Sequence, residues 1–177
     1  MGKLSNINHV YKPVLLSMGS NIGNKKQYLE MAIAELASFG AFHNVQVSSL
    51  YETEPLGFTE QDSFLNIALT FWTVLEPTDV FVECKKIEKK LGRKQRKKWH
   101  EREIDIDIIL FGDEIVATEQ LTIPHASMQD RKFVLTPSLE IAAHFIHPIF
   151  KKTIQELYEV CGDESSVVRT EELILPS

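Results

Sequence analysis

Two aspartates stand one residue apart in the segment REIDIDIIL, residues 102–110. Asp105 and Asp107 interrupt an apolar run that otherwise predicts a buried strand. Because side chains two apart on a strand project from the same face, the two carboxylates must be neighbours. Two like charges this close raise a pKa unless basic side chains or divalent cations compensate them. The alternative is an amphipathic strand whose polar face meets water.

A strongly basic stretch precedes this strand. Residues 85–98 contain nine basic residues and one acid, Glu88, in a chain whose net charge is -6. The stretch is either the solvated face of a helix with its loop or a cradle for a polyanion, such as phosphate or nucleic acid. Arg93, Trp99 and Arg102 could hold a polyphosphate that the two aspartates meet through Mg²⁺. Magnesium suits such a site because it is bound by one or two carboxylates together with substrate phosphate oxygens.

Two other constellations could bind a ligand. His125 is followed by Arg131 six residues later, which indicates either a structural histidine or a phosphate contact. Phe64 and Asn66 share one face of an alternating strand, where they could belong to the core or could stack on and hydrogen-bond a flat heterocycle. The segment GSNIGNK, residues 19–25, resembles a phosphate-binding P-loop but lacks its spacing, so it predicts only a glycine-dependent turn from a strand into a helix.

The order of predicted elements indicates an α+β fold. Hydrophobic periodicity predicts strands near residues 13–18, 45–49, 64–72 and 104–111. Asn24, with Gln27 three residues later, predicts the start of a helix that ends before Gly40, and Pro77 predicts the first turn of a second helix that ends before Gly92. This βαββαβ order is the ferredoxin-like arrangement. From Gly112 onward the pattern predicts an appended C-terminal region of short strands and helices. We expect a flexible N-terminal arm over residues 1–12 and a single domain over residues 13–177.

Composition places the chain among cytoplasmic proteins with one domain. The 177 residues are 44% hydrophobic and 25% charged, which is enough to form a core. The two cysteines, Cys84 and Cys161, are too few for a disulfide framework and predict packing thiols. No apolar stretch approaches the ~20 residues of a membrane span. The N-terminus also lacks the apolar core of a signal peptide.

Four blocks, taken in order, resemble the 6-hydroxymethyl-7,8-dihydropterin pyrophosphokinase family. The blocks are LSMGSNIGN, VSSLYETEPLGFTEQDSFLNIAL, IEKKLGRKQRKKWHEREIDIDIILFGDEIV and LTIPHASMQDRKFVLTPSLEIA. The resemblance covers residues 14–157 and implies a ferredoxin-like core. It also implies transfer of the β,γ-diphosphoryl group of ATP to the pterin hydroxymethyl oxygen, in folate biosynthesis, with two Mg²⁺ ions and ATP as co-substrate.

The resemblance also implies roles for individual residues. Asp105 and Asp107 would hold both metal ions and would be catalytic together with Arg93 and Arg102. The residues expected around ATP are Glu88, Arg93, Trp99, Arg102, Ile108, Thr122, His125 and Arg131. The residues expected around the pterin are Thr53, Glu54, Leu56, Phe64, Asn66, Trp99 and Phe133. Glu103 is a departure from the family pattern and would add a negative charge beside the metal pair. We expect a monomer that binds these two small molecules and neither nucleic acid nor membrane.

The main alternative is a nucleic-acid-binding module, because sheets of this kind can present aromatic side chains to RNA and the 85–98 stretch is basic. An RNA-recognition sheet would carry the run K/R-G-F/Y-G/A-F-V-x-F/Y, which does not occur in the sequence. A small-ligand regulatory domain is a weaker alternative, because it leaves the two aspartates and the arginines unexplained.

Overall fold

The computed structural model describes residues 10–54, 62–94 and 101–171. Its strands are β1 (Lys12–Ser20), β2 (His43–Val47), β3 (Leu50–Thr53), β4 (Phe64–Thr73), β5 (Asp105–Phe111), β6 (Val116–Ala117), β7 (Thr122–Ile123) and β8 (Val167–Glu171). Its helices are α1 (Lys25–Ser38), α2 (Pro77–Lys90), the 3-10 helix η1 (Met128–Asp130), α3 (Lys132–Ala142) and α4 (Ile154–Glu159). Within these ranges, none of the helices has the length and apolar character needed to cross a membrane.

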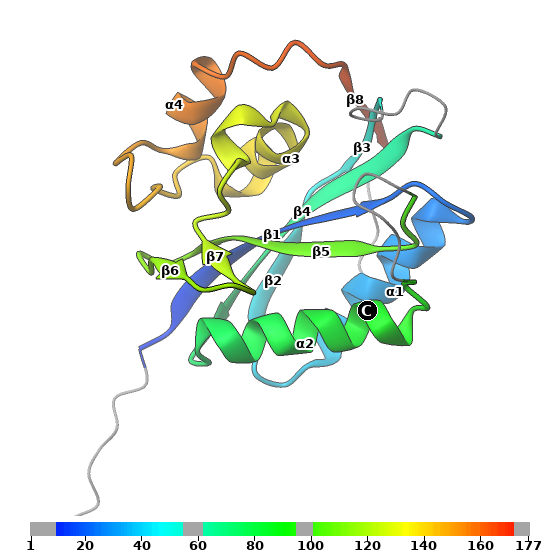
Figure 1. The fold of residues 1–177 in the computed structure, drawn as a ribbon, viewed down its shortest axis with the longest axis horizontal. Coiled ribbons are helices and arrows are strands. Elements are labelled where there is room, and N and C mark those ends of the chain that lie inside the picture. Colours follow the sequence, from blue (N-terminus) through cyan, green and yellow to red (C-terminus); the bar gives the residue numbers. More distant parts are fainter. Residues whose placement is uncertain (1–9, 55–61, 95–100, 172–177) are drawn as a thin grey trace, which may run out of the picture.

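The main sheet is antiparallel and lies between two layers of helices. Its strands follow the order β5-β1-β4-β3-β8, and β2 pairs with β4 beside β3. Helices α1 and α2 cover one face, while α3 and α4 lie on the other (Figure 1). A separate two-stranded ribbon, β6-β7, follows β5. The predicted mixture of helices and strands is therefore confirmed, and the structure shows that the sheet is antiparallel.

Strand periodicity explains why the sheet has a core on each side. On β1, Leu16 and Met18 point towards α1 and α2 and belong to the larger buried cluster. Leu15 points the opposite way and packs with residues of α3 and α4. On β5, Ile106 joins the first cluster and Ile109 joins the second. Because both faces are partly covered, the strands read as nearly continuous apolar runs.

The two helices predicted before β2 and before β5 begin and end as their capping signals indicate. The Asn24 side chain accepts a hydrogen bond from the backbone N–H of Gln27 at 3.2 Å and starts α1. Pro77 occupies the first turn of α2, where no hydrogen-bonding N–H is required. Gly92 follows α2 with φ 86°, a left-handed conformation that favours glycine. Cys84 is fully buried on the inner face of α2, as expected for a packing thiol.

The strand predicted over residues 45–49 is instead two shorter strands, β2 and β3. Ser48 lies between them, where its backbone N–H donates to the Ala68 carbonyl at 3.0 Å. The Ser48 hydroxyl oxygen accepts from the Ala68 N–H at 2.9 Å. The serine side chain thus takes the place of a backbone acceptor, and the pairing with β4 shifts at this point.

The C-terminal tail also differs from the expectation, because β8 joins the main sheet instead of remaining in an appended region. Residues Val167–Glu171 pair with β3 in antiparallel register. The Arg169 Nε donates to the Ser49 hydroxyl at 2.8 Å. Glu140 of α3 accepts from the Ser49 N–H at 2.9 Å and from the Tyr51 hydroxyl at 3.0 Å. Contacts from the tail and from α3 therefore fix the position of β3 and of Ser49, which precedes it.

The N-terminal arm was predicted over residues 1–12. Strand β1 begins at Lys12, the last residue of that predicted arm, and residues 1–9 lie outside the described part.

A buried histidine predicts how stability depends on pH. The His147 Nδ1 accepts from the backbone N–H groups of Ile149 and Phe150, both at 3.2 Å. Burial lowers the pKa of His147 below 6.5. Since the folded state disfavours the protonated ring, stability is present above pH ~6.5 and is lost as the pH falls below it.

We expect His147→Asn to weaken this acid sensitivity, because asparagine keeps an acceptor near the Nδ1 position but does not titrate. Urea unfolding between pH 7 and pH 5 measures the effect, with the exposed His144→Asn as the control. Parallel pH profiles for the wild type and His147→Asn would contradict the assignment.

Candidate active site

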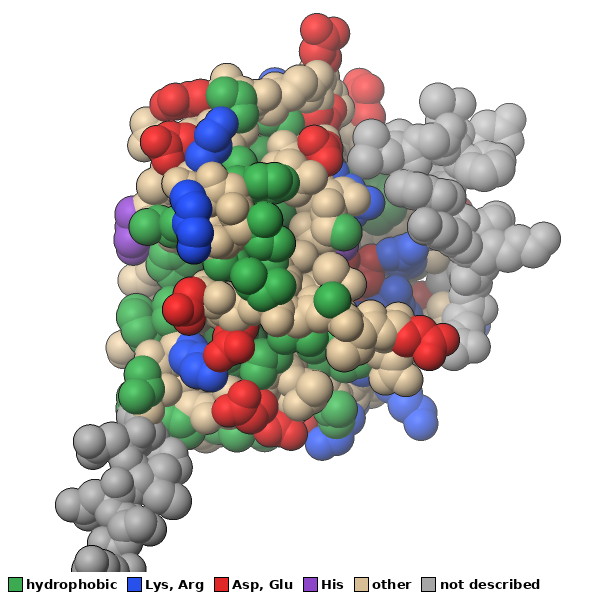
Figure 2. All heavy atoms as spheres, turned by 60° about the vertical axis from the view of Figure 1, so that its left-hand side comes forward, with side chains coloured by type: hydrophobic (Ala, Val, Ile, Leu, Met, Phe, Trp, Pro, Cys, Tyr) green, Lys and Arg blue, Asp and Glu red, His purple; other side chains and the backbone are tan. Residues whose placement is uncertain are grey.

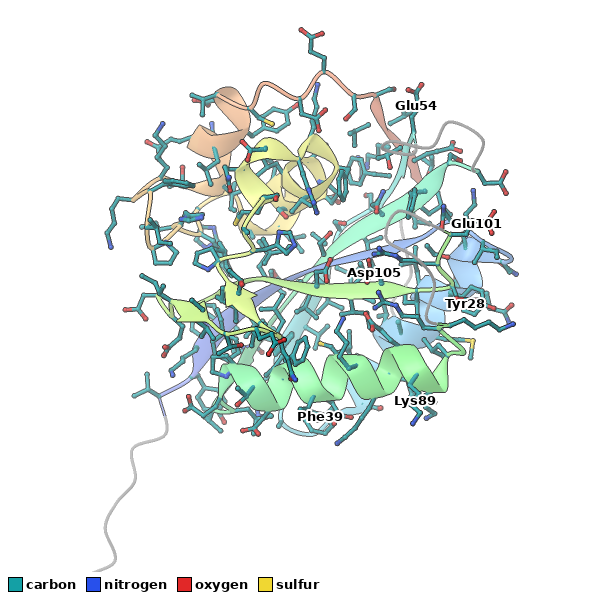
Figure 3. All side chains as sticks on the ribbon, viewed as in Figure 1. Tyr28, Phe39, Glu54, Lys89, Glu101 and Asp105 are labelled. Atoms are coloured by element: carbon teal, nitrogen blue, oxygen red, sulfur yellow. The ribbon has the colours of Figure 1, made fainter. Side chains whose placement is uncertain are left out.

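The two aspartates lie at the start of β5, on the sheet face turned away from α1 and α2. Asp105 pairs with Gly19 of β1 and Asp107 pairs with Ser17. Their neighbour Ile106 points to the opposite face and is 1% exposed. Figure 3 labels Asp105 on β5, which runs between α2 and α3. The prediction that both carboxylates share one face is confirmed.

Burial and mutual repulsion act on this pair. The Asp105 side chain is only 17% exposed. The pKa of Asp107 is raised to about 6, first because the group is buried and second because the Asp105 charge is near. A pair of carboxylates whose charges are poorly solvated is a strong attractor for positive charge.

Two arginines supply that charge to Asp105. The Arg93 Nη1 lies 2.8 Å from Asp105 Oδ1. The Arg102 Nη1 donates to the other oxygen, Oδ2. Both arginines reach the same carboxylate, Arg93 from within the basic stretch and Arg102 from the segment that follows it. These are direct ion pairs to Asp105, and the expectation that the arginines meet the aspartates through a polyphosphate and Mg²⁺ stays a prediction.

Glu88 of α2 holds this arrangement from the edge of the sheet. Its carboxylate is almost fully buried and accepts from the Ile106 backbone N–H at 2.7 Å and from Lys85 Nζ at 2.8 Å. It also forms an ion pair with Arg93. Glu88 therefore satisfies the free edge of β5 between the two aspartates and orients one of their arginines. Each of these contacts is internal, and the predicted contact of Glu88 with ATP stays a prediction.

A second group of polar side chains, from β3 and β4, lies on the same sheet face as the aspartates, with β1 between them. Asn66 of β4 is 3% exposed, and its Nδ2 donates to the Thr53 hydroxyl of β3 at 2.7 Å. Gly19 of β1 lies between Asn66 and Asp105, because it pairs with both. Phe64 shares the Asn66 face and is half-buried, whereas Glu54 at the end of β3 is exposed (Figure 3). The predicted pterin residues Thr53, Phe64 and Asn66 are thus brought together.

Gly19 is required here by a close approach. A Cβ added to Gly19 would lie 2.6 Å from Asn66 Oδ1, inside van der Waals contact. We expect Gly19→Ala to displace the Asn66 amide and to destabilise the fold by about 1–3 kcal/mol. Urea unfolding and pterin affinity measure the two effects. Gly40→Ala is the control, because no atom lies within 4 Å of its added Cβ. Unchanged stability and pterin binding in Gly19→Ala would contradict the packing argument.

The segment that follows β5 adds a histidine and an arginine. The backbone N–H of His125 donates to the Ile109 carbonyl of β5 at 3.0 Å, which holds the histidine beside the strand. Burial, followed by the nearby Arg131 charge, lowers the pKa of His125. The Arg131 guanidinium lies 5.8 Å from the Phe133 ring centre. His125, Arg131 and Phe133 therefore form one group, while Thr122 is exposed on β7.

The remaining predicted site residues have different outcomes. The Ile108 side chain is 4% exposed in the core beneath α1 and α2, on the face opposite the aspartates. Its predicted contact with a nucleotide can therefore involve only the backbone. Glu103 is buried and accepts from the Lys94 backbone N–H at 3.4 Å, so it anchors the chain ahead of β5. Leu56 and Trp99 lie outside the described residues.

Sequence reasoning missed two contributors to the site. Lys85 was counted only as part of the basic stretch, yet its Nζ donates to Glu88 and, at 3.3 Å, to the Ile106 carbonyl. Asn21 was seen only as part of a turn, yet it bonds to the backbone of Arg102. The spacing of Lys85 and Glu88, three apart on a helix, was a usable signal. No local signal links Asn21 to Arg102.

The donor set fits magnesium better than a transition metal. Within residues 10–54, 62–94 and 101–171, no group of three or more His, Cys, Asp and Glu side chains could hold a metal ion. Two adjacent carboxylates supply hard oxygen ligands. Mg²⁺ is commonly held by one or two carboxylates, with waters and substrate phosphates completing its shell. The raised pKa of Asp107 also indicates a pair that a cation would stabilise.

Comparison with known proteins assigns the family. Residues 15–143 match the family model described as 7,8-dihydro-6-hydroxymethylpterin-pyrophosphokinase (HPPK). The chain belongs to the HPPK family. A 2-amino-4-hydroxy-6-hydroxymethyldihydropteridine pyrophosphokinase of Aquifex aeolicus is 42% identical over 143 residues, covering 81% of this chain and 88% of the relative. The Bacillus subtilis protein of the same name is 43% identical over 126 residues, covering 71% and 75% of the two chains.

Solved HPPK structures share the fold of this chain. A structure of HPPK-DHPS in complex with substrates matches with a TM-score of 0.66 and 16% identity over 85% of this chain. The wild-type Plasmodium falciparum HPPK-DHPS with pteroate has the same TM-score, identity and coverage. The chain spans only 43% and 42% of those two chains. HPPK membership disfavours the nucleic-acid-binding alternative. Figure 2 shows that acidic and basic side chains of the described residues are interspersed on the face that it draws.

Proposed function

We propose that this HPPK family member transfers the β,γ-diphosphoryl group of ATP to the hydroxymethyl oxygen of 6-hydroxymethyl-7,8-dihydropterin, releasing AMP, in folate biosynthesis. One observation carries the proposal. Gly19 pairs with Asp105 on one side and with Asn66 on the other. A charged group suited to polyphosphate therefore lies next to a buried amide suited to a flat polar ring. The two reactants could meet above β1.

We also infer that the core is ferredoxin-like. The order β5-β1-β4-β3, with α1 and α2 on one face, is the order that a βαββαβ chain produces when β2 and β3 act as one broken strand. The likeness to solved HPPK structures supports an HPPK fold without testing this finer description. A monomeric state and a cytoplasmic location remain predictions.

On the nucleotide side, Arg93 and Arg102 would bind the triphosphate. Their guanidinium groups balance the charge of Asp105 here, and phosphate oxygens would compete for the same donors. His125 and Arg131 belong to the segment after β5, where His125 is held beside Ile109, two residues past Asp107. They would bind a second part of the triphosphate. Burial and the Arg131 charge lower the pKa of His125, and the ring would donate a hydrogen bond to a phosphate oxygen.

Asp105 and Asp107 would hold two Mg²⁺ ions, which when bound would neutralise charge on the transferring phosphates. The protein's own contribution is rigidity. The two carboxylates are carried by a strand whose Ile106 is buried beneath α2, and Glu88 holds the edge of that strand. Their positions therefore need little rearrangement when substrates arrive.

On the pterin side, the amide of Asn66 would hydrogen-bond the polar edge of the ring, with Thr53 fixing its orientation. Phe64 and Phe133 would supply aromatic faces, and Glu54, Leu56 and Trp99 are the further residues we expect there. The attacking atom is the substrate's own hydroxymethyl oxygen, which would attack the β-phosphorus, so no protein nucleophile is required. Rate enhancement would come from positioning, charge stabilisation and exclusion of water.

The decisive experiment measures AMP formation by the full chain with ATP, Mg²⁺ and 6-hydroxymethyl-7,8-dihydropterin. We expect AMP and the pterin diphosphate in equal amounts. The matched control is 6-methyl-7,8-dihydropterin, which lacks the attacking oxygen and should give no AMP. Absence of AMP with the hydroxymethyl substrate, or equal AMP with both pterins, would refute the proposed function.

A further inference from the structure

The turn that follows β1 is joined to the chain ahead of Asp105 by two hydrogen bonds. The Arg102 backbone N–H donates to the Asn21 side-chain oxygen at 2.7 Å. In return, the Asn21 backbone N–H donates to the Arg102 carbonyl at 3.1 Å. The two bonds form a closed ring between the two residues, with the side-chain oxygen and backbone N–H of Asn21 facing the backbone N–H and carbonyl of Arg102, so they fix direction as well as distance.

This contact is partly buried and joins distant parts of the chain. Asn21 is 1% exposed, and its partner lies 81 residues away. A backbone N–H that loses its partner in such a place cannot easily be satisfied by water. The bond therefore constrains the peptide of Arg102 more strongly than an exposed hydrogen bond would.

Fixing the Arg102 backbone also limits where the Arg102 side chain can reach. Its guanidinium donates to Asp105 Oδ2, three residues along the chain. The arginine side chain is long and flexible, so its reach to Asp105 depends on where its backbone is held. On the other side of the pair, Arg93 is oriented by the Glu88 carboxylate. Glu88 thus orients one arginine through its side chain, and Asn21 orients the other through its backbone.

We propose that Asn21 is a positioning residue that sets the direction of Arg102 towards Asp105 and the phosphates of the nucleotide. This inference rests on the proposed function. It assigns a role to the GSNIGN turn, which is not a phosphate loop itself: the turn supports the arginine that meets the phosphates. Asn21 acts through Arg102 and does not touch either substrate.

The test compares two replacements of Asn21. Asn21→Leu has a similar size but no acceptor, and we expect kcat/KM for ATP to fall by about tenfold or more. The KM for the pterin should stay within about twofold, because the Thr53–Asn66 pair is not disturbed. Asn21→Asp keeps the accepting oxygen and should recover most of the loss. Ser20→Ala is the control, because Ser20 is equally buried but its hydroxyl has no hydrogen-bond partner in the described part of the chain.

A double-mutant cycle separates positioning from a general structural effect. If Asn21 acts through Arg102, Asn21→Leu should change kcat/KM for ATP by less than about twofold in an Arg102→Ala background. Calorimetry with a non-hydrolysable ATP analogue gives a second readout, in which the same non-additivity should appear in affinity.

The outcomes also separate this inference from the proposed function. Equal effects of Asn21→Leu with and without Arg102, or a normal kcat/KM in a folded Asn21→Leu protein, would overturn the positioning role. If Asn21→Leu does not fold, Asn21→Ala enters the same cycle and must meet the same criterion. A wild-type protein that forms no AMP would instead refute the function, whereas an active wild type with an additive cycle would refute only the inference.

Discussion

Replacing Asp107 with asparagine should abolish AMP formation while leaving the protein folded. The substitution keeps the shape of the side chain but removes one of the two charges that would hold magnesium. We expect turnover to fall by about 100-fold or more, because electrostatic groups at a reacting centre contribute at least this much. The unfolding temperature should not fall, because the variant loses one of two neighbouring, partly buried negative charges. AMP release and thermal unfolding measure the two effects.

Two further substitutions make this prediction specific. Asp105→Asn should also be severely impaired, and it additionally weakens the ion pairs with Arg93 and Arg102. The control is Asp113→Asn, because Asp113 lies two residues after the end of β5 but is exposed. Wild-type AMP formation by a correctly folded Asp107→Asn protein would show that the carboxylate pair does not hold the metal ions.

The second large effect concerns stability and arises from Glu88. Glu88→Leu removes a buried carboxylate that accepts from the Ile106 N–H and from Lys85 Nζ and pairs with Arg93. Breaking a buried charged network from one side costs about 3–5 kcal/mol. Here the Ile106 N–H loses its acceptor, and Lys85 and Arg93 each lose one of their partners. Urea unfolding should report a loss of this size. Activity should fall as well, because Arg93 loses the group that orients it towards Asp105.

Glu83 on the same helix offers a matched control. Its carboxylate pairs with the exposed Lys86 at 3.0 Å, and such a helix pair is worth up to about 0.5 kcal/mol. Glu83→Leu should therefore leave stability nearly unchanged. Glu88→Gln keeps one acceptor and should lie between Glu88→Leu and the wild type. Equal losses from the Glu83 and Glu88 leucine variants would rule out the special role of the buried network.

Local spacing predicted the parts of the site that lie within one element. Strand period two placed Asp105 and Asp107 on one face, and it placed Phe64 and Asn66 together on another strand. The Asn24 cap and the Pro77 and Gly92 signals predicted the ends of two helices. These predictions succeeded because each depends on the geometry of a single element, which neighbouring residues determine.

The spacing of residues in the sequence could not predict which distant segments pair with one another. The division into β2 and β3 depends on a hydrogen bond between the Ser48 side chain and β4. The position of β8 depends on contacts such as the bond from Arg169 to Ser49, which are 120 residues apart. The short segment VVRTE that forms β8 carries no signal for the strand edge on which it will pair.

The sequence by itself determined that two carboxylates share a strand face, that a basic stretch precedes them and that the chain resembles the HPPK family. Only the tertiary structure decided which groups meet those carboxylates. It turned Glu88 inward to the edge of β5, placed Gly19 between the aspartates and Asn66, and joined Asn21 to Arg102. The physical reason is that side-chain direction follows from local backbone period, whereas the partner of each buried charge follows from packing among segments far apart in the chain.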